Sequence, residues 1–169
     1  SLARAGLTPD VFAWSPPTEV PEPFQGLLVH EGDMTSALER FYEEPMLLEV
    51  LAEGRSAEYY FREVVLKGQN SGCAAEFGLI EIELDHFPPA LQELILRGEK
   101  PLGGILNESG ITYKSRPLGY FSVAREALPP KLCALGSNNV FFGRYNQLQS
   151  TDDTCLARIL EIVPDPHQP

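Results

Sequence analysis

The segment Tyr59–Leu66, with the sequence YYFREVVL, places the strongest constraint on how this chain folds. Aromatic and β-branched residues dominate it and the turn-forming residues 67–72 follow, a pattern typical of a β-strand that ends in a turn. Alternation along a strand predicts one face with Tyr60, Arg62, Val64 and Leu66 and another with Tyr59, Phe61, Glu63 and Val65. Both faces are apolar enough to be covered, so the strand carries charged side chains into the interior.

Arg62 is therefore the first candidate for a functional residue. A buried charge without a partner is costly, so it should be paired or meet a ligand. The planar guanidinium, with its fork of donors, suits a carboxylate better than a lysine does, and we expect Arg62 to bind one. Two structural alternatives stay open: the side chain reaches the sheet edge, or it pairs with an internal glutamate.

The composition narrows the class of protein. A chain of 169 residues is expected to form one domain with a sizeable core. Its formal net charge of −11 argues against nucleic-acid or acidic-membrane partners, which need a basic face, but not against a small anionic ligand. No apolar stretch approaches the roughly 18 residues of a membrane span, and no export signal is visible. Cys73, Cys133 and Cys155 lack CxxC spacing and suggest reduced thiols in a cytoplasmic protein.

The order of the predicted elements indicates the fold class. Residues 1–25 are proline-rich and are expected to be an extended N-terminal segment, and residues 26–169 are expected to form the domain proper. The sequence predicts helices over 32–42 and 87–98, a loop over 101–104, and strands over 46–52, 59–66, 73–84, 113–123, 139–149 and 155–163. The expected fold is α+β: a mainly antiparallel sheet with a few covering helices.

Several chemistries lack support in the sequence. It has no Gly-x-Ser-x-Gly elbow, no phosphate-binding glycine loop and no dinucleotide fingerprint. The histidines, His30, His86 and His167, are scattered and have no metal-ligand spacing, so no metal site is expected. What remains are embedded charged residues and glycine-rich loops.

The order of short motifs is more informative than any one of them. Asp33-Met-Thr precedes an amphipathic helix, and a strand with Phe-Arg-Glu-Val-Val-Leu follows. A helix then ends before Lys100-Pro-Leu-Gly103, and a closing hairpin begins at Gly143-Arg144 and ends at Leu160–Pro164. Over roughly residues 26 to 164, the chain resembles the chorismate pyruvate-lyase superfamily, in particular its divergent bacterial and archaeal branch.

The resemblance implies a fold, an activity and a set of site residues. Members fold as one α+β domain with the ligand enclosed beneath flaps, and they eliminate pyruvate from chorismate to give 4-hydroxybenzoate without a metal or organic cofactor. Arg62 stands where the family's carboxylate-binding arginine stands. Met34 and Leu102 match the residues whose backbone touches the ligand, and Gly103 follows in the same loop. Glu161 matches the glutamate near the ring hydroxyl and the scissile ether.

Two departures from the family pattern concern this site. Glu161 matches only if the final hairpin is two residues longer than in the better-known lyases; otherwise Ile159 stands there. Those lyases also carry a second arginine where this chain has Glu76, so Lys114 or Arg144 becomes the candidate for a second substrate carboxylate. Arg144 is equally well explained as the structural partner of an acid such as Glu76.

Two classes of function are therefore open. The chain is either a chorismate lyase, or a relative acting on another cyclic acid, or a binding module like the effector-sensing domains of one bacterial regulator family, which share this fold. Those domains are normally fused to a helix-turn-helix, which the proline-rich start is not expected to supply. In each case the expected partner is a small aromatic or cyclic carboxylate, and the expected state a monomer or small homo-oligomer.

Overall fold

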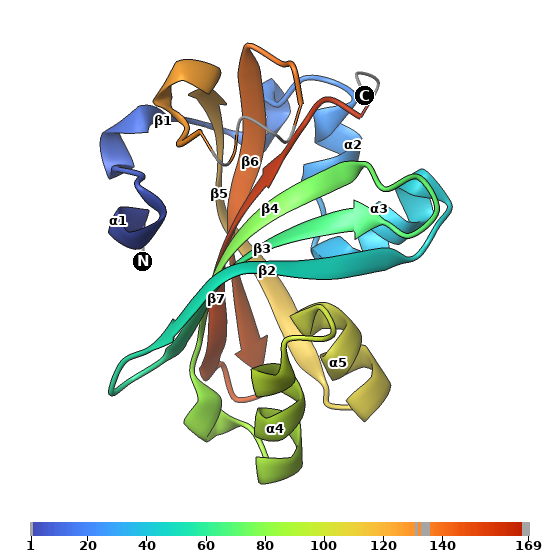
Figure 1. Cartoon of the computed structure of the whole chain (residues 1–169), viewed down its shortest axis with the longest axis vertical. Coiled ribbons are helices and arrows are strands. Elements are labelled where there is room, and N and C mark those ends of the chain that lie inside the picture. Colours follow the sequence, from blue (N-terminus) through green and yellow to red (C-terminus); the bar gives the residue numbers. More distant parts are fainter. Residues whose placement is uncertain (1, 131, 133–135, 167–169) are drawn as a thin grey trace.

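The computed structural model describes residues 2–130, 132 and 136–166, so Cys133 and His167 lie outside the described residues. They form one domain around a seven-stranded antiparallel sheet with the strand order β1-β5-β6-β7-β4-β3-β2 (Figure 1). The strands are β1 (Phe12–Ser15), β2 (Met46–Arg55), β3 (Tyr60–Gly68), β4 (Ala74–Ile82), β5 (Tyr113–Ala124), β6 (Val140–Ser150) and β7 (Cys155–Val163). This confirms the predicted α+β class and its antiparallel sheet.

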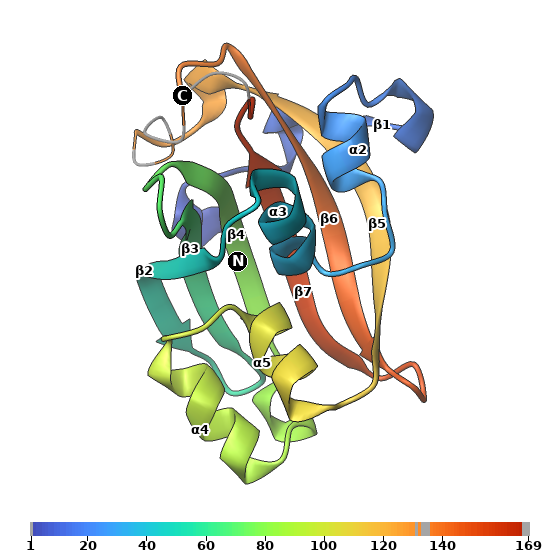
Figure 2. The ribbon, with the colours of Figure 1, turned by 90° about the vertical axis from the view of Figure 1, so that its right-hand side faces the viewer.

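One face of the sheet, here called the helix face, carries most of the helices. Figure 2 shows α3 and α5 in front of the sheet, with α2 above them and α4 below. The helices are α1 (Leu2–Ala5), α2 (Phe24–Leu28), α3 (Met34–Tyr42), α4 (Pro89–Arg97) and α5 (Leu102–Ser109). Short 3-10 turns lie before or after strands, at Pro9–Val11, Pro17–Glu19, Leu84–His86 and Arg125–Ala127. Among the described residues, no helix is both long and apolar enough to cross a bilayer.

The two faces of β3 divide the core as the alternation predicts. Tyr60 and Val64 pack with α4 and α5 on the helix face. Phe61 and Val65 pack on the opposite face, in a cluster that includes Phe77. Arg62 and Glu63 are buried along with the apolar side chains, because both faces of this part of the strand are covered.

The N-terminal segment differs from the extended lead-in that its prolines predict. It contains α1 and the strand β1, which pairs antiparallel with β5 at one end of the sheet. Phe12 is buried against Phe121, with ring centroids 4.7 Å apart. The local sequence cannot predict that this short, proline-flanked segment forms a strand, because its pairing depends on the free edge of β5.

Residues 101–104 also differ from their prediction as a loop. The first turn of α5 begins at Leu102, and Pro101 is its N-cap residue. Two glycines lower helix propensity, but burial of Leu102, Ile105 and Leu106 against the helix face outweighs that local cost. The predicted 113–123 strand is present as β5, with a register shift between Pro117 and Gly119.

Candidate ligand-binding site

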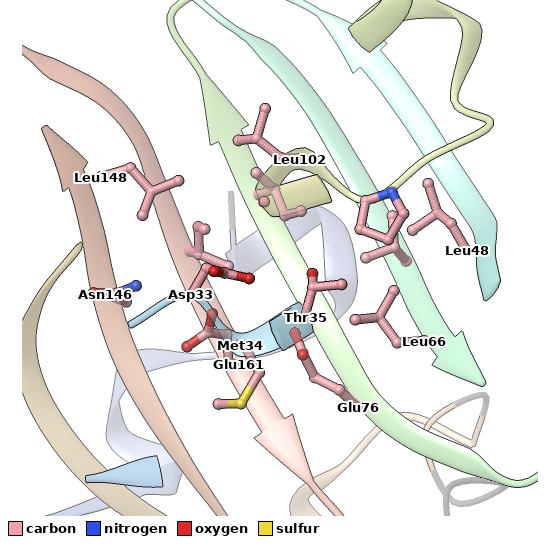
Figure 3. A pocket seen from close by; sticks show the side chains of 15 residues that line it. Asp33, Met34, Thr35, Leu48, Leu66, Glu76, Leu102, Asn146, Leu148 and Glu161 are labelled. Atoms are coloured by element: carbon pink, nitrogen blue, oxygen red, sulfur yellow. The ribbon is translucent and has the colours of Figure 1, made fainter. Parts of the chain in front are cut away.

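A small cavity of about 40 Å³ lies between the helix face and the first turns of α3 and α5 (Figure 3). That volume has room for about one water molecule and none for a ligand. Its lining is apolar along the sides and polar at one end. It consists of Asp33, Met34, Thr35, Leu48, Val64, Leu66, Glu76, Ile80, Pro101, Leu102, Gly103, Asn146, Leu148, Ile159 and Glu161.

The start of α3 is held in place by Asp33. Its side chain caps the helix by accepting a hydrogen bond from the Ser36 amide at 2.8 Å. The same carboxylate accepts from Asn107 Nδ2 of α5 at 3.3 Å. A Cβ on Gly103 would stand 2.8 Å from Asp33 Oδ1, so only glycine allows this approach. Asp33 thereby joins the N-termini of the two helices that cover the cavity.

The start of α5 has no comparable cap. Pro101 lacks a side-chain acceptor, and the amides of residues 102–104 have no acceptor among the described residues. Free amides at a helix N-terminus carry partial positive charge and attract anions. Because Pro101, Leu102 and Gly103 line the cavity, this end of α5 faces the place where a carboxylate would lie.

Arg62 lies just behind the cavity wall. Its cross-strand partner Ile80 lines the cavity, whereas Arg62 is not among the described residues that line it. The guanidinium is fully buried and donates only long hydrogen bonds, to Ile95 O at 3.4 Å and to Lys100 O at 3.5 Å. Nε has no partner, and no acid among the described residues forms a salt bridge with Arg62. Burial lowers the pKa of this guanidinium, with Tyr60 acting against that effect.

Arg144 and Glu161 form a buried ion pair on neighbouring strands. Arg144 of β6 stands opposite Glu161 of β7, and its Nε donates to Glu161 Oε2. Its other nitrogens donate to the carbonyls of Leu28 at 3.3 Å, His30 at 3.0 Å and Gly32 at 3.2 Å. Burial raises the pKa of Glu161, and Arg144 opposes that rise. The pair connects the cavity to the segment between α2 and α3.

Glu76 is the third carboxylate at the polar end of the cavity. It is 4% exposed, and its Oε2 has no hydrogen-bond partner in the described structure. Burial, and then the neighbouring Glu161, raise its pKa well above the usual range. Gly78, two residues further along β4, stands opposite Glu161. A Cβ there would lie 3.0 Å from Val64 and 3.2 Å from the Glu76 carboxylate, so the missing side chain leaves room for these two neighbours.

The structure brings most of the predicted site residues together. Met34, Leu102, Gly103 and Glu161 line one cavity, and Ile159 lines it as well, on the same face of β7. Lys114 does not: it is exposed and pairs with Asp153 at 3.4 Å.

The structure also separates the two readings of Arg144. Its guanidinium is committed to Glu161 and three backbone carbonyls, so its position fits a structural partner of an acid, with Glu161 as the direct partner. Asn146 and Thr35 were missed as cavity residues. Asn146 could have been found, because it lies two residues from Arg144 on the same face of a strand. Nothing in the sequence marks Thr35 as a cavity residue. Among the described residues, no group of three or more His, Cys, Asp or Glu side chains is arranged to hold a metal.

Comparison with solved structures gives the fold a precedent. PhnF from Mycobacterium smegmatis matches with a TM-score of 0.61 at 14% identity, over 83% of this chain and 67% of that one. The effector domain of PhnF alone matches with a TM-score of 0.57 at 14% identity, over 80% and 90% of the two chains. The chain therefore shares its fold with the effector domain of PhnF.

A third structure agrees. The ligand-binding domain of a protein assigned to the GntR family of transcriptional regulators, from Bordetella bronchiseptica, matches with a TM-score of 0.52 at 12% identity, over 72% and 87% of the two chains. These effector domains share the chorismate lyase-like fold, so the resemblance is supported at the level of fold. No protein-family model and no curated protein matches the sequence.

Proposed function

We propose that this chain is a small-molecule-binding domain that takes a small carboxylate beneath α3 and α5 and does not turn it over. The observation that carries the proposal is the buried Arg62, whose Nε is unpaired and which forms no salt bridge with an acid among the described residues. Unsatisfied buried polar atoms are rare in native proteins and call for a missing partner. A planar carboxylate satisfies such a guanidinium with two parallel bonds.

The uncapped start of α5 supports the same ligand chemistry. Arg62 Nη2 lies 3.5 Å from the carbonyl oxygen of Lys100, two residues before Leu102. The guanidinium and the free amides of α5 therefore flank the same short segment, and both attract an anion. Because the cavity is far smaller than the 300 Å³ or more of a typical ligand pocket, binding requires α3 or α5 to move outward.

The likeness to effector domains favours binding over turnover. The residue to which the resemblance gives the role of acid, Glu161, is held in an ion pair with Arg144. Arg144 in turn donates hydrogen bonds to carbonyls of the segment before α3. A ligand that displaces Glu161 can therefore change the position of this segment, which lies outside the cavity. Such a link is what a sensing domain needs.

Titration calorimetry with 4-hydroxybenzoate tests the proposal. We expect saturable binding to the native chain and a loss of affinity of at least about tenfold in Arg62→Ala, because a charge-assisted bidentate contact is lost. Arg62→Lys should restore little, since a point charge cannot make the planar fork. Arg55→Ala, which removes an exposed arginine of β2, is the matched control. Unchanged affinity in a folded Arg62→Ala would show that the anchor lies elsewhere.

Chorismate lyase activity is the second candidate, because Arg62, Met34, Leu102 and Glu161 lie at or next to one cavity. The enzyme reading expects equal amounts of pyruvate and 4-hydroxybenzoate from chorismate, insensitive to chelators. It also expects Glu161→Gln to lower the rate by roughly 10²–10⁴-fold, the scale of general acid catalysis. Binding of 4-hydroxybenzoate without turnover of chorismate supports the binding domain, and turnover contradicts it.

A further inference from the structure

The described structure leaves two buried side-chain atoms without hydrogen-bond partners: Arg62 Nε, a donor, and Glu76 Oε2, an acceptor. Both side chains start from the helix face, on the adjacent strands β3 and β4. The cross-strand partner of Glu76 is Leu66, four residues from Arg62 and so about 13 Å away along the strand. A ligand carboxylate can accept a hydrogen bond from Arg62 Nε. Glu76 Oε2 needs a hydrogen-bond donor, which has to come from a second group of the ligand.

Charge at the polar end of the cavity shows what kind of donor fits. The carboxylates of Asp33, Glu76 and Glu161 turn towards the same part of the cavity (Figure 3). Within the described residues the cation bonded to this group is Arg144, through Glu161. Three acids against one guanidinium leave an excess of negative charge when ionised, and like charges in a dry site repel strongly.

We propose that the ligand carries an ammonium group at the end remote from its carboxylate, and that this group binds between Glu76 and Glu161. An ammonium supplies the missing positive charge and up to three N–H donors, whereas a hydroxyl supplies one donor and no charge. The apolar sides of the cavity, including Leu66, Leu148 and Ile159, suit an apolar body between the two ends. The ligand class is an elongated amino acid, and this inference rests on the proposed function.

Protonation of Glu76 gives the proposal a second signature. The titratable or charged groups that act on Glu76 are Glu161 of β7, Arg144 of β6 and Asp33 of α3. Burial raises the pKa of Glu76 and keeps it protonated above its ordinary range. An ammonium makes the ionised form the favoured one, so binding releases a proton, and affinity rises with pH as Glu76 ionises.

The test compares two ligands that differ only in the group at issue, 4-(aminomethyl)benzoate and 4-(hydroxymethyl)benzoate, by calorimetry in two buffers of different ionisation enthalpy. We expect the amine to bind about tenfold more tightly or better, since hydrogen bonds to charged groups are stronger. We also expect proton release with the amine alone. Glu76→Gln should abolish the preference while the alcohol still binds, and Glu58→Gln, an exposed acid in the β2–β3 turn, should change neither.

The outcomes separate the two proposals. If both ligands bind the native chain and the amine is not preferred, the ammonium site is excluded and the carboxylate-binding function stands. If neither ligand binds and 4-hydroxybenzoate does not bind either, the proposed function fails and the inference fails with it. Because the ligand comparison uses the native chain, it decides the question even if Glu76→Gln does not fold.

Discussion

At the scale of single residues, the buried guanidinium of Arg144 contributes through every nitrogen it carries. It donates to Glu161 on the neighbouring strand. It also donates to the carbonyls of Leu28, His30 and Gly32, which are more than a hundred positions away in the sequence. His30 Nδ1 accepts from the Gly32 amide at 3.1 Å, and burial followed by the charge of Arg144 lowers the pKa of this histidine. The neutral imidazole and the guanidinium together shape the segment that leads into α3.

Arg144→Met is expected to lower the free energy of unfolding by about 3–5 kcal/mol, because Glu161 is left as an uncompensated buried charge. Urea denaturation at neutral pH measures the change. The double variant Arg144→Met with Glu161→Leu should recover part of the loss, since both charges are then absent. Lys114→Met removes an exposed partner of Asp153 and should cost less than about 1 kcal/mol. Equal effects of the two single changes would contradict a structural role for the buried pair.

At the scale of secondary-structure elements, the cavity is built by the first turns of two helices from distant parts of the chain. α3 begins with a side-chain cap and α5 begins without one, and the two meet where Asp33 packs on Gly103. Gly103 and Gly104 are adjacent in the same turn, yet they differ in surroundings. A Cβ at Gly103 meets Asp33, whereas a Cβ at Gly104 meets nothing within 4 Å.

These neighbours form a matched pair of substitutions. Gly103→Ala should destabilise the protein by about 1–3 kcal/mol, because the added methyl group forces α5 away from Asp33. Gly104→Ala should instead stabilise it by about 0.5–1 kcal/mol, since alanine is the better helix former where space is free. Thermal unfolding of the two variants measures the difference. If both substitutions stabilise the protein, α3 and α5 are not in the close contact described above.

At the scale of the whole molecule, the N-terminal segment is part of the domain. β1 closes one end of the sheet against β5, and Phe12 completes the cluster on the face opposite the helices. Trp14 lies over Gly119 of β5, where a Cβ would come within 2.9 Å of the indole ring. The prolines that follow β1 direct the chain around the sheet edge to α2, and so to the helix face where the cavity lies.

Phe12→Ala is therefore expected to destabilise the whole domain by about 3–5 kcal/mol, the usual cost of removing a buried phenylalanine. Denaturant unfolding followed by circular dichroism measures it. Leu118→Ala, which truncates a side chain that is 46% exposed, should change the stability by no more than about 0.5 kcal/mol. A Phe12→Ala protein as stable as the native chain would mean that the packing of Phe12 on Phe121 does not hold residues 1–25 to the domain.

The sequence by itself determined the local elements, because they depend on neighbours within a few positions. Alternation in the Tyr59–Leu66 run set the two faces of β3 and showed that Arg62 would be buried. Asp33 capping α3, and Gly98 ending α4 with a φ of 65°, follow from short-range hydrogen bonding and backbone freedom. The even spacing in the last strand likewise placed Ile159 and Glu161 on one face.

Only the tertiary structure decided which of these side chains meet. Whether Arg144 binds a ligand or Glu161 depends on β6 lying beside β7, and the approach of residues 28–32 depends on packing across the whole sheet. The helix at residues 102–109 opposes the low helix propensity of its two glycines, which is worth less than burial against the sheet. The strand at residues 12–15 depends on the edge of β5 with which it pairs. The cavity itself arises where the first turns of α3 and α5 meet the sheet, and non-local contacts of this kind have no signature in a single stretch of sequence.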